Sequence, residues 1–317
     1  MKVKELKKNL NNSVEPVYFI TGEDSYLIEF ALNTFSSLLN EEVIAFNLNV
    51  FQDLTNIGDI ISALRSYPLM DNRKVVVVKE PAAPTKEQEK ILVQYFEKPE
   101  IQSVFVIVDD GSFKNMNKYG EVVDCSSLSF EDCIKQIELV FKGEKREIEK
   151  DAAKKLAEYC LCDLRKIHNE IDKLVCFRNT GVIKAEDIEA VVTPSTDYKI
   201  YEFTQSLADK NPLRAKNIME NLVANGNKPL SLMQAILSQY KRMLYVLISN
   251  GTDEEIAKNL KIKPYAVKMS RRTAEHYSPK ILKAYCEGLV DLEYKSLTGK
   301  ININDALKSA ISILIVK

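Results

Sequence analysis

The sequence of 317 residues contains no tryptophan, two histidines, and only ten residues each of glycine and proline. So little glycine and proline excludes a collagen-like or low-complexity chain, and six scattered cysteines exclude a disulfide-dense scaffold. Long apolar runs are also missing, because the longest, such as Val75–Val78 and Val104–Val108, are far too short to cross a bilayer. No apolar signal-peptide core follows the basic start of the chain. We therefore expect a folded, cytoplasmic protein with no membrane association.

Residue types that usually carry chemistry are sparse. Neither His168 nor His276 lies beside a nucleophile motif such as G-x-S-x-G. Cys160, Cys162 and Cys176 join His168 as potential metal ligands, but Cys-x-Cys is not the usual zinc-knuckle spacing and all four fall in one helix-rich segment. Structural thiols in a reducing compartment explain them better. We therefore expect no metal site and no other cofactor.

Charge is distributed unevenly along the chain. The formal net charge is −1, yet residues 211–317 carry 17 Lys and Arg against 9 Asp and Glu, a net charge of +8. Residues 1–210 carry the balance of −9. A chain polarised in this way is expected to present different surfaces to different partners.

The first 140 residues alternate β-branched runs with helical patterns, which is typical of an α/β domain. Two valine-rich runs show no polar alternation, as expected for parallel strands that are covered on both faces. The expected strands are Val17–Ile20, Val43–Leu48, Lys74–Val78, Val104–Val108 and Glu121–Cys125, and the expected helices are Asp24–Leu39, Thr55–Tyr67 and Thr85–Phe96.

Beyond residue 140 the strand signals largely disappear. Residues 150–177 and 184–192 have helical patterns, with punctuation near Asp163 and Gly181. From Asn211 onward the chain is predicted to be amphipathic helix, broken at 225–229, 250–252, 261–264 and 297–300. The predicted fold class is α/β plus all-α, with domains of residues 1–140, 141–209 and 210–317.

The turn after the first predicted strand has the setting of a phosphate-binding loop but not its residues. A Walker A loop starting at Gly22 needs Gly, Lys and Ser or Thr at positions 27–29, where the sequence has Leu, Ile and Glu. Glu23 and Asp24 would repel phosphate and suit a helix N-terminus instead. Asp109 and Asp110 end a strand as Walker B carboxylates do, but without a phosphate loop they have no metal-bound phosphate to hold. The sequence therefore predicts no catalytic residue.

A set of segments distributed along nearly the whole chain is more specific than any of these motifs. In order, they are GEDSYLIEFAL, YPLMDNRKVVVVKE, HNEIDKLVCF, YEFTQSLADKNPLRAKNIMENL, SLMQAILSQYKRMLYV, GTDEEIAKNLKIKPYAVKMSRR and LVDLEYKSLTGKI. Together they resemble the delta subunit family of bacterial DNA polymerase III. The resemblance implies an AAA+-like parallel α/β domain that has lost its nucleotide site, a small helical lid domain and a C-terminal helical collar domain, at 1–140, 141–209 and 210–317 respectively.

The resemblance also implies a function in DNA replication. Members of the family bind the ring-shaped sliding clamp, the beta subunit, and open the ring or hold it open for loading onto primed DNA. The collar would join the clamp-loader ATPase subunits, gamma or tau, and delta-prime. ATP would be hydrolysed by these partners, so the chain would have no catalytic site of its own within the nucleotidyltransferase holoenzyme. Whether it touches primer-template DNA stays open.

The clamp contact of the family is a hydrophobic pair, commonly Leu-Phe, whose matching positions here are Leu69 and Met70. Pro68 is expected to end the helix Thr55–Tyr67 and to project both apolar side chains before a polar stretch. From the residues alone, packing beneath the loop is the more common fate of such a pair. The resemblance favours clamp binding, with methionine replacing an aromatic residue as a departure from the family pattern.

A basic segment near the C-terminus has a second interpretation. Asp253–Leu260, a turn and Tyr265–Glu275 resemble a helix-turn-helix, so the alternative function is a DNA-binding regulator. Lys268, Arg271 and Arg272 have the i, i+3, i+4 spacing that places side chains on one helix face. Without a neighbouring Asn or Gln for base readout, these charges suit DNA phosphates, and a solvated basic face is the other interpretation.

Overall fold

The computed structural model describes residues 1–109, 111–178 and 180–316. The chain divides into two compact units, Met1–Ser127 and Leu128–Lys317. Among the described residues, no helix combines the length and the apolar character needed to cross a membrane.

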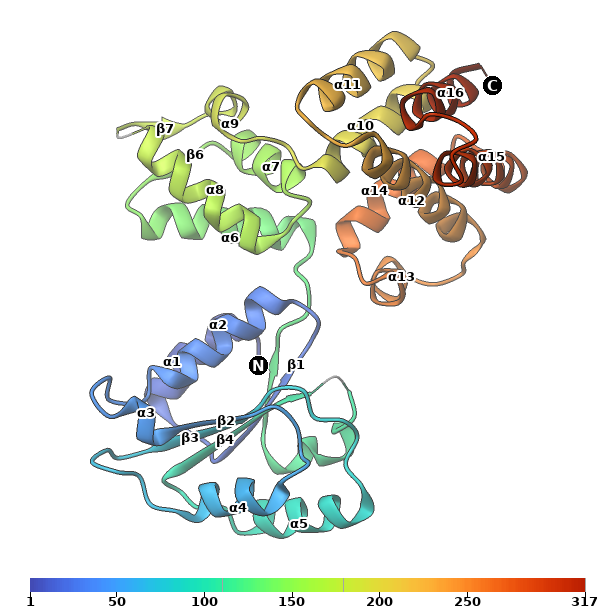
Figure 1. Ribbon diagram of the computed structural model, residues 1–317. Coiled ribbons are helices and arrows are strands. Elements are labelled where there is room, and N and C mark those ends of the chain that lie inside the picture. Colours follow the sequence, from blue (N-terminus) through green and yellow to red (C-terminus); the bar gives the residue numbers. More distant parts are fainter. Residues whose placement is uncertain (110, 179, 317) are drawn as a thin grey trace. The chain divides into compact units, whose positions relative to one another are not determined.

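The first unit is built on a five-stranded sheet with the order β2-β3-β4-β1-β5, and all of its paired strands are parallel. Helices α1 and α2 lie over one face and α4 and α5 over the other (Figure 1). The valines of β3 are buried because both faces are covered, as the unalternating pattern predicts. The strands are β1 Val17–Thr21, β2 Leu48–Phe51, β3 Lys74–Val78, β4 Ser103–Asp109 and β5 Glu121–Asp124; the helices are α1 Val3–Asn12, α2 Ser25–Ser36, α3 Ile44–Asn47, α4 Ile57–Arg65 and α5 Lys86–Glu97, with a 3-10 helix at Lys114–Tyr119.

Several sequence-based boundaries in this unit are wrong, among them the end of the helix expected to reach Leu39, which ends at Ser36. The expected strand Val43–Leu48 is instead the short helix α3, and β2 begins only at Leu48. The β-branched run is misleading because the chain forms a helical turn here, across which the Asn47 side chain donates to the Val43 carbonyl. The helix expected to reach Tyr67 ends at Arg65, with Ser66 already extended. Proline disfavours the helical conformation of the residue before it, so Tyr67 does not extend the helix as predicted.

The second unit consists almost entirely of helices. Its first part contains a small parallel ladder of β6 and β7. Tyr265 of α14 stacks on Phe130 of α6 with ring centroids 4.4 Å apart. Proline occupies the first turn of α11, α12, α14 and α15. Helices α12 and α14 begin at predicted breaks, whereas the start of α15 at Pro279 was not predicted. The elements are α6 Phe130–Gly143, β6 Glu147–Ile148, α7 Lys150–Tyr159, α8 Leu164–Phe177, β7 Val182–Ile183, α9 Ala185–Val191, α10 Thr196–Ala208, α11 Pro212–Ala224, α12 Pro229–Ile248, α13 Asp253–Leu260, α14 Pro264–Ala274, α15 Pro279–Leu297 and α16 Ile303–Val316.

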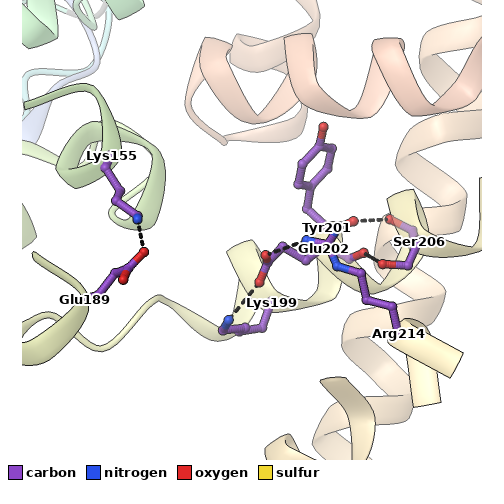
Figure 2. Close-up of polar contacts among 8 residues, drawn as sticks. Lys155, Glu189, Lys199, Tyr201, Glu202, Ser206 and Arg214 are labelled. Atoms are coloured by element: carbon purple, nitrogen blue, oxygen red, sulfur yellow. Dashed lines mark hydrogen bonds and ion pairs between the residues drawn. The ribbon is translucent and has the colours of Figure 1, made fainter. Parts of the chain in front are cut away.

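Helix α10 packs into the core of the C-terminal helices. Ile200 and Phe203 of α10 are buried in the same apolar cluster as Met219 of α11 and Leu289 of α15. Figure 2 shows Glu202 of α10 between Lys199 and Arg214, and the ion pair with Arg214 is 3.3 Å long and ties α10 to α11. The predicted boundaries after residues 140 and 209 place most of α6 in the first domain and α10 in the second. In the structure, α6 belongs to the second compact unit, and α10 packs into the core of the C-terminal helices. The three-domain division itself stays a prediction.

Candidate functional site

An exposed apolar loop joins α4 to β3 in the first unit. Tyr67 is 85% exposed, Leu69 51% and Met70 83%, so three large apolar side chains of one short loop face solvent. The sequence predicts that Leu69 and Met70 project outward, and the structure places both outside the core. Such neighbouring exposed apolar groups are typical of a surface that contacts another macromolecule.

The backbone of this loop is held by a buried side chain from α3. The Asn47 side chain is completely buried, and its Oδ1 accepts a hydrogen bond from the Leu69 N–H at 2.7 Å. Its Nδ2 donates to the Leu69 carbonyl at 2.9 Å. Met70 follows with φ +54°, a left-handed conformation that is unfavourable for a residue with a Cβ atom. The carboxamide therefore fixes the peptide groups on both sides of Leu69 and opposes relaxation of the strained residue beside it.

Further contacts hold the two ends of the loop. Asp71 Oδ2 accepts from the Asn40 N–H at 2.8 Å, which joins the loop to the segment after α2. At the other end, Lys74 is buried in β3 and its Nζ donates to the Ser66 hydroxyl. Burial lowers the pKa of Lys74 from its ordinary value. The loop thus combines a fixed backbone with exposed apolar side chains.

Sequence reasoning did not find Asn47. The residue was expected to lie within a strand, and nothing in its local pattern indicates that its partner is Leu69, 22 residues further along. A lone asparagine before an apolar run carries no motif. Only the folding of α3 against the loop brings the two together.

The turn between β1 and α2 is occupied by the Asp24 side chain and by the backbone of residues 125–126. Gly22 has φ +119°, and a Cβ atom added there would lie 2.3 Å from the Cys125 carbonyl carbon. Asp24 Oδ1 accepts from the Tyr26 N–H at 3.0 Å and the Leu27 N–H at 3.3 Å. These are the helix N-terminal groups that a bound phosphate would use. Asp24 therefore caps the helix as the sequence predicts, whereas Glu23 accepts from the Ser127 N–H after β5.

Other potential catalytic or metal-binding groups form backbone hydrogen bonds or are buried in the protein core. Asp109 Oδ1 accepts from the Gly111 N–H at 2.7 Å and the Phe113 N–H at 3.0 Å, while Asp110 lies outside the described residues. Cys160 and Cys162 are buried, and burial raises the pKa of Cys160 to about 12. Throughout the described ranges, no three His, Cys, Asp or Glu side chains group in a way that could hold a metal ion.

The three basic residues of α14 have different environments. Arg271 Nε donates to Asp253 Oδ1 at 2.9 Å, and its terminal nitrogens lie 3.5 Å from the Val246 carbonyl and 3.4 Å from the Gly251 carbonyl. It therefore joins α14 to the end of α12 and the start of α13. Lys268 and Arg272 are exposed at the rim of a cavity of about 260 Å³, which is also lined by Glu158, Tyr198, Tyr201, Tyr265 and Met269.

Two family models match the chain. The model described as DNA polymerase III, delta subunit, covers residues 18–126, and the model described as DNA polymerase III delta subunit, C-terminal domain, covers residues 197–314. The chain belongs to the DNA polymerase III delta subunit family. The first matched region contains the exposed loop, and the second contains the basic residues of α14.

Curated relatives agree with this assignment. The chain is 27% identical to the DNA polymerase III subunit delta of Bacillus subtilis, an alignment that covers 94% of this chain and 91% of the relative. It is 26% identical to the probable DNA polymerase III subunit delta of Aquifex aeolicus over 74% of this chain and 71% of the relative.

The solved structure of the Bacillus subtilis DNA clamp loader delta protein has the same fold. The TM-score is 0.83 at 24% identity, and the match covers 99% of this chain and 100% of the other. The sequence-based fold class, a parallel α/β domain followed by helical regions, is confirmed by the sheet and by this likeness.

Proposed function

We propose that this chain is a clamp-loader subunit that binds the sliding clamp through Leu69 and Met70 and opens the ring or holds it open. The observation that carries the proposal is the loop itself: its apolar side chains are exposed while its backbone is anchored by Asn47. An anchored loop loses little conformational entropy on binding, and its side chains enter an apolar pocket with a gain from burial. Methionine adapts its shape to such a pocket.

The decisive experiment measures clamp affinity in purified components. Leu69→Ala/Met70→Ala should weaken binding of the sliding clamp by about 100-fold or more, because central apolar anchors each contribute about 2 kcal/mol or more to an interface. Biolayer interferometry with immobilised clamp measures the change.

Ile101→Ala is a matched control, since Ile101 lies in the same unit and is 81% exposed, close to the exposure of Met70. It should bind as the wild type does. Equal affinity of the double variant and the wild type would contradict the assigned site. A wild-type protein that does not retain the clamp would contradict the function.

The helical C-terminal region is the part we propose to assemble with partner subunits. It would join the gamma or tau ATPase subunits and delta-prime. Its helices α10, α11, α12, α14, α15 and α16 share one extensive apolar core, and α13 packs in a second, smaller cluster with α12 and α14. ATP hydrolysis would belong to those partners. The self-filled turn at Gly22 and Asp24 supports this division of roles.

Contact with primer-template DNA is proposed for Lys268 and Arg272 rather than for all three basic residues. Both are exposed, whereas the Arg271 charge is paired with Asp253. A helix-turn-helix regulator would read bases with the N-terminal part of its second helix. Here Tyr265, at that end of α14, stacks on Phe130, so this geometry supports the clamp-loader subunit over the regulator.

A further inference from the structure

Asn47 lies where the loop carrying Leu69 and Met70 meets the rest of the first unit. Its side chain is fully buried, and both ends of its carboxamide are used: one accepts from the Leu69 N–H and the other donates to the Leu69 carbonyl. A carboxamide has one acceptor and one donor end, so it can satisfy both backbone groups of a single residue. These two bonds fix the backbone of Leu69 and so determine the direction in which its side chain projects.

We propose that Asn47 is a positioning residue for the clamp-binding pair. It holds the loop in the conformation that presents Leu69 and Met70 before the partner arrives. This inference rests on the proposed function of the pair, although the order that Asn47 imposes on the loop can be measured without any partner.

The conformation at Met70 explains why such an anchor is needed. Its φ of +54° is unfavourable for an L-residue with a side chain, so a loop released from Asn47 would populate other conformations. Affinity falls in proportion to the fraction of molecules in the binding-competent conformation. Asp71 still holds the far end of the loop through Asn40, so the loss should be partial. We expect Asn47→Ala to weaken clamp binding by about 10-fold.

Loop order can be read from a single fluorophore, because the chain has no tryptophan. Tyr67→Trp introduces one at a position that is 85% exposed, beside the clamp-binding pair. Adding Asn47→Ala should produce a faster anisotropy decay. Gln88→Ala is the matched control: the Gln88 carboxamide also accepts from one N–H, that of Thr85 at 2.9 Å, and donates to one carbonyl, that of Leu54 at 2.8 Å, but it does not touch the loop. This control should leave the decay unchanged.

Clamp affinity provides the second measurement. Asn47→Ala should lose about 10-fold in the wild-type background and nothing further when combined with Leu69→Ala/Met70→Ala, because the two changes act through the same contact. Gln88→Ala should retain full affinity. If Asn47→Ala does not fold, Asn47→Asp preserves the side-chain size and an acceptor for the Leu69 N–H but, when ionised, cannot donate to the Leu69 carbonyl. It should change both measurements in the same direction.

Unchanged anisotropy and unchanged affinity in the Asn47 variants would overturn the proposal. So would an equal affinity loss from Gln88→Ala, because that result indicates general destabilisation of the unit. If Leu69→Ala/Met70→Ala itself retains full affinity, the assigned clamp-binding site is wrong, and the anisotropy alone then decides whether Asn47 orders the loop.

Discussion

Arg271, Lys268 and Arg272 lie within five positions of one another on α14, yet their surroundings separate their roles. The Arg271 guanidinium bonds Asp253 and reaches two main-chain carbonyls, that of Val246 in α12 and that of Gly251 in the turn before α13. Lys268 and Arg272 are exposed beside the Glu158 cavity, and burial raises the pKa of Glu158. Helical spacing places the three charges on one face, but the neighbouring elements decide which of them is paired within the protein.

Arg271→Ala should lower the free energy of unfolding by about 1–2 kcal/mol, because it removes charge-assisted hydrogen bonds to a half-buried partner. Lys268→Ala should change the free energy of unfolding by less than about 0.5 kcal/mol, as expected for an exposed side chain. Urea denaturation of the two variants beside the wild type measures the difference.

The same variants distinguish the DNA proposal. Lys268→Ala/Arg272→Ala in the assembled clamp loader should reduce the salt dependence of primer-template binding, with the logarithmic slope falling by about two. An unchanged slope would show that these charges contact only solvent. A stability loss from Lys268→Ala equal to that from Arg271→Ala would contradict the structural distinction between them.

At the scale of elements, the turn between β1 and α2 lies between a strand and a helix, as a phosphate-binding loop does, but another segment of the chain packs against it. Gly22 allows the backbone to approach the Cys125–Ser126 peptide, and Asp24 N–H bonds the Cys125 carbonyl at 3.2 Å. The Glu23 carboxylate accepts from the Ser127 N–H at 3.0 Å. The segment after β5 therefore lies against the turn, and its peptide groups form hydrogen bonds with the Asp24 N–H and the Glu23 carboxylate.

Gly22→Ala should destabilise the first unit by roughly 3–5 kcal/mol, because a Cβ atom would overlap backbone atoms at a φ that side chains rarely adopt. Gly58→Ala is the comparison, since a Cβ atom there has nothing within 4 Å and lies in α4. It should be neutral or stabilise by about 0.5 kcal/mol. Thermal denaturation followed by circular dichroism measures both, and a Gly22→Ala protein as stable as the wild type would refute the close approach.

At the scale of the whole molecule, the two proposed interactions fall in different units. Leu69 and Met70 belong to Met1–Ser127, whereas the C-terminal family region at 197–314 lies within Leu128–Lys317. Net negative charge is carried by residues 1–210, which include the clamp-binding pair, and net positive charge by residues 211–317, which include most of the C-terminal family region. Clamp binding and loader assembly should therefore be separable.

Leu69→Ala/Met70→Ala should still assemble with the ATPase subunits and delta-prime, because the changed side chains are solvent-exposed and lie outside the helical region proposed to assemble. Size-exclusion chromatography of the mixed subunits measures assembly, and clamp pull-down from the same fractions should fail. Loss of both properties together would show that the loop variant damages the fold or that the loop also contacts a loader subunit.

Much of the architecture could be predicted because it depends on local patterns. Valine-rich runs indicated the buried strands β3 and β4, and the predicted breaks at 225–229 and 261–264 end at the prolines that begin α12 and α14. The failures at Val43–Leu48 and at the end of α4 occurred where the Asn47 side chain bonds across a helical turn and where the chain becomes extended before Pro68. Short segments of this kind are decided by a few specific contacts rather than by periodicity.

The sequence by itself determined the fold class, the family resemblance and the identity of the apolar pair, because each of these is encoded in residue order. Only the tertiary structure decided that Leu69 and Met70 are exposed, that Asn47 anchors them, and that Arg271 is already paired. These properties depend on side chains from separate elements meeting in space. A hydrogen bond between Asn47 and Leu69 has no sequence signature, since it exists only after α3 has packed against the loop.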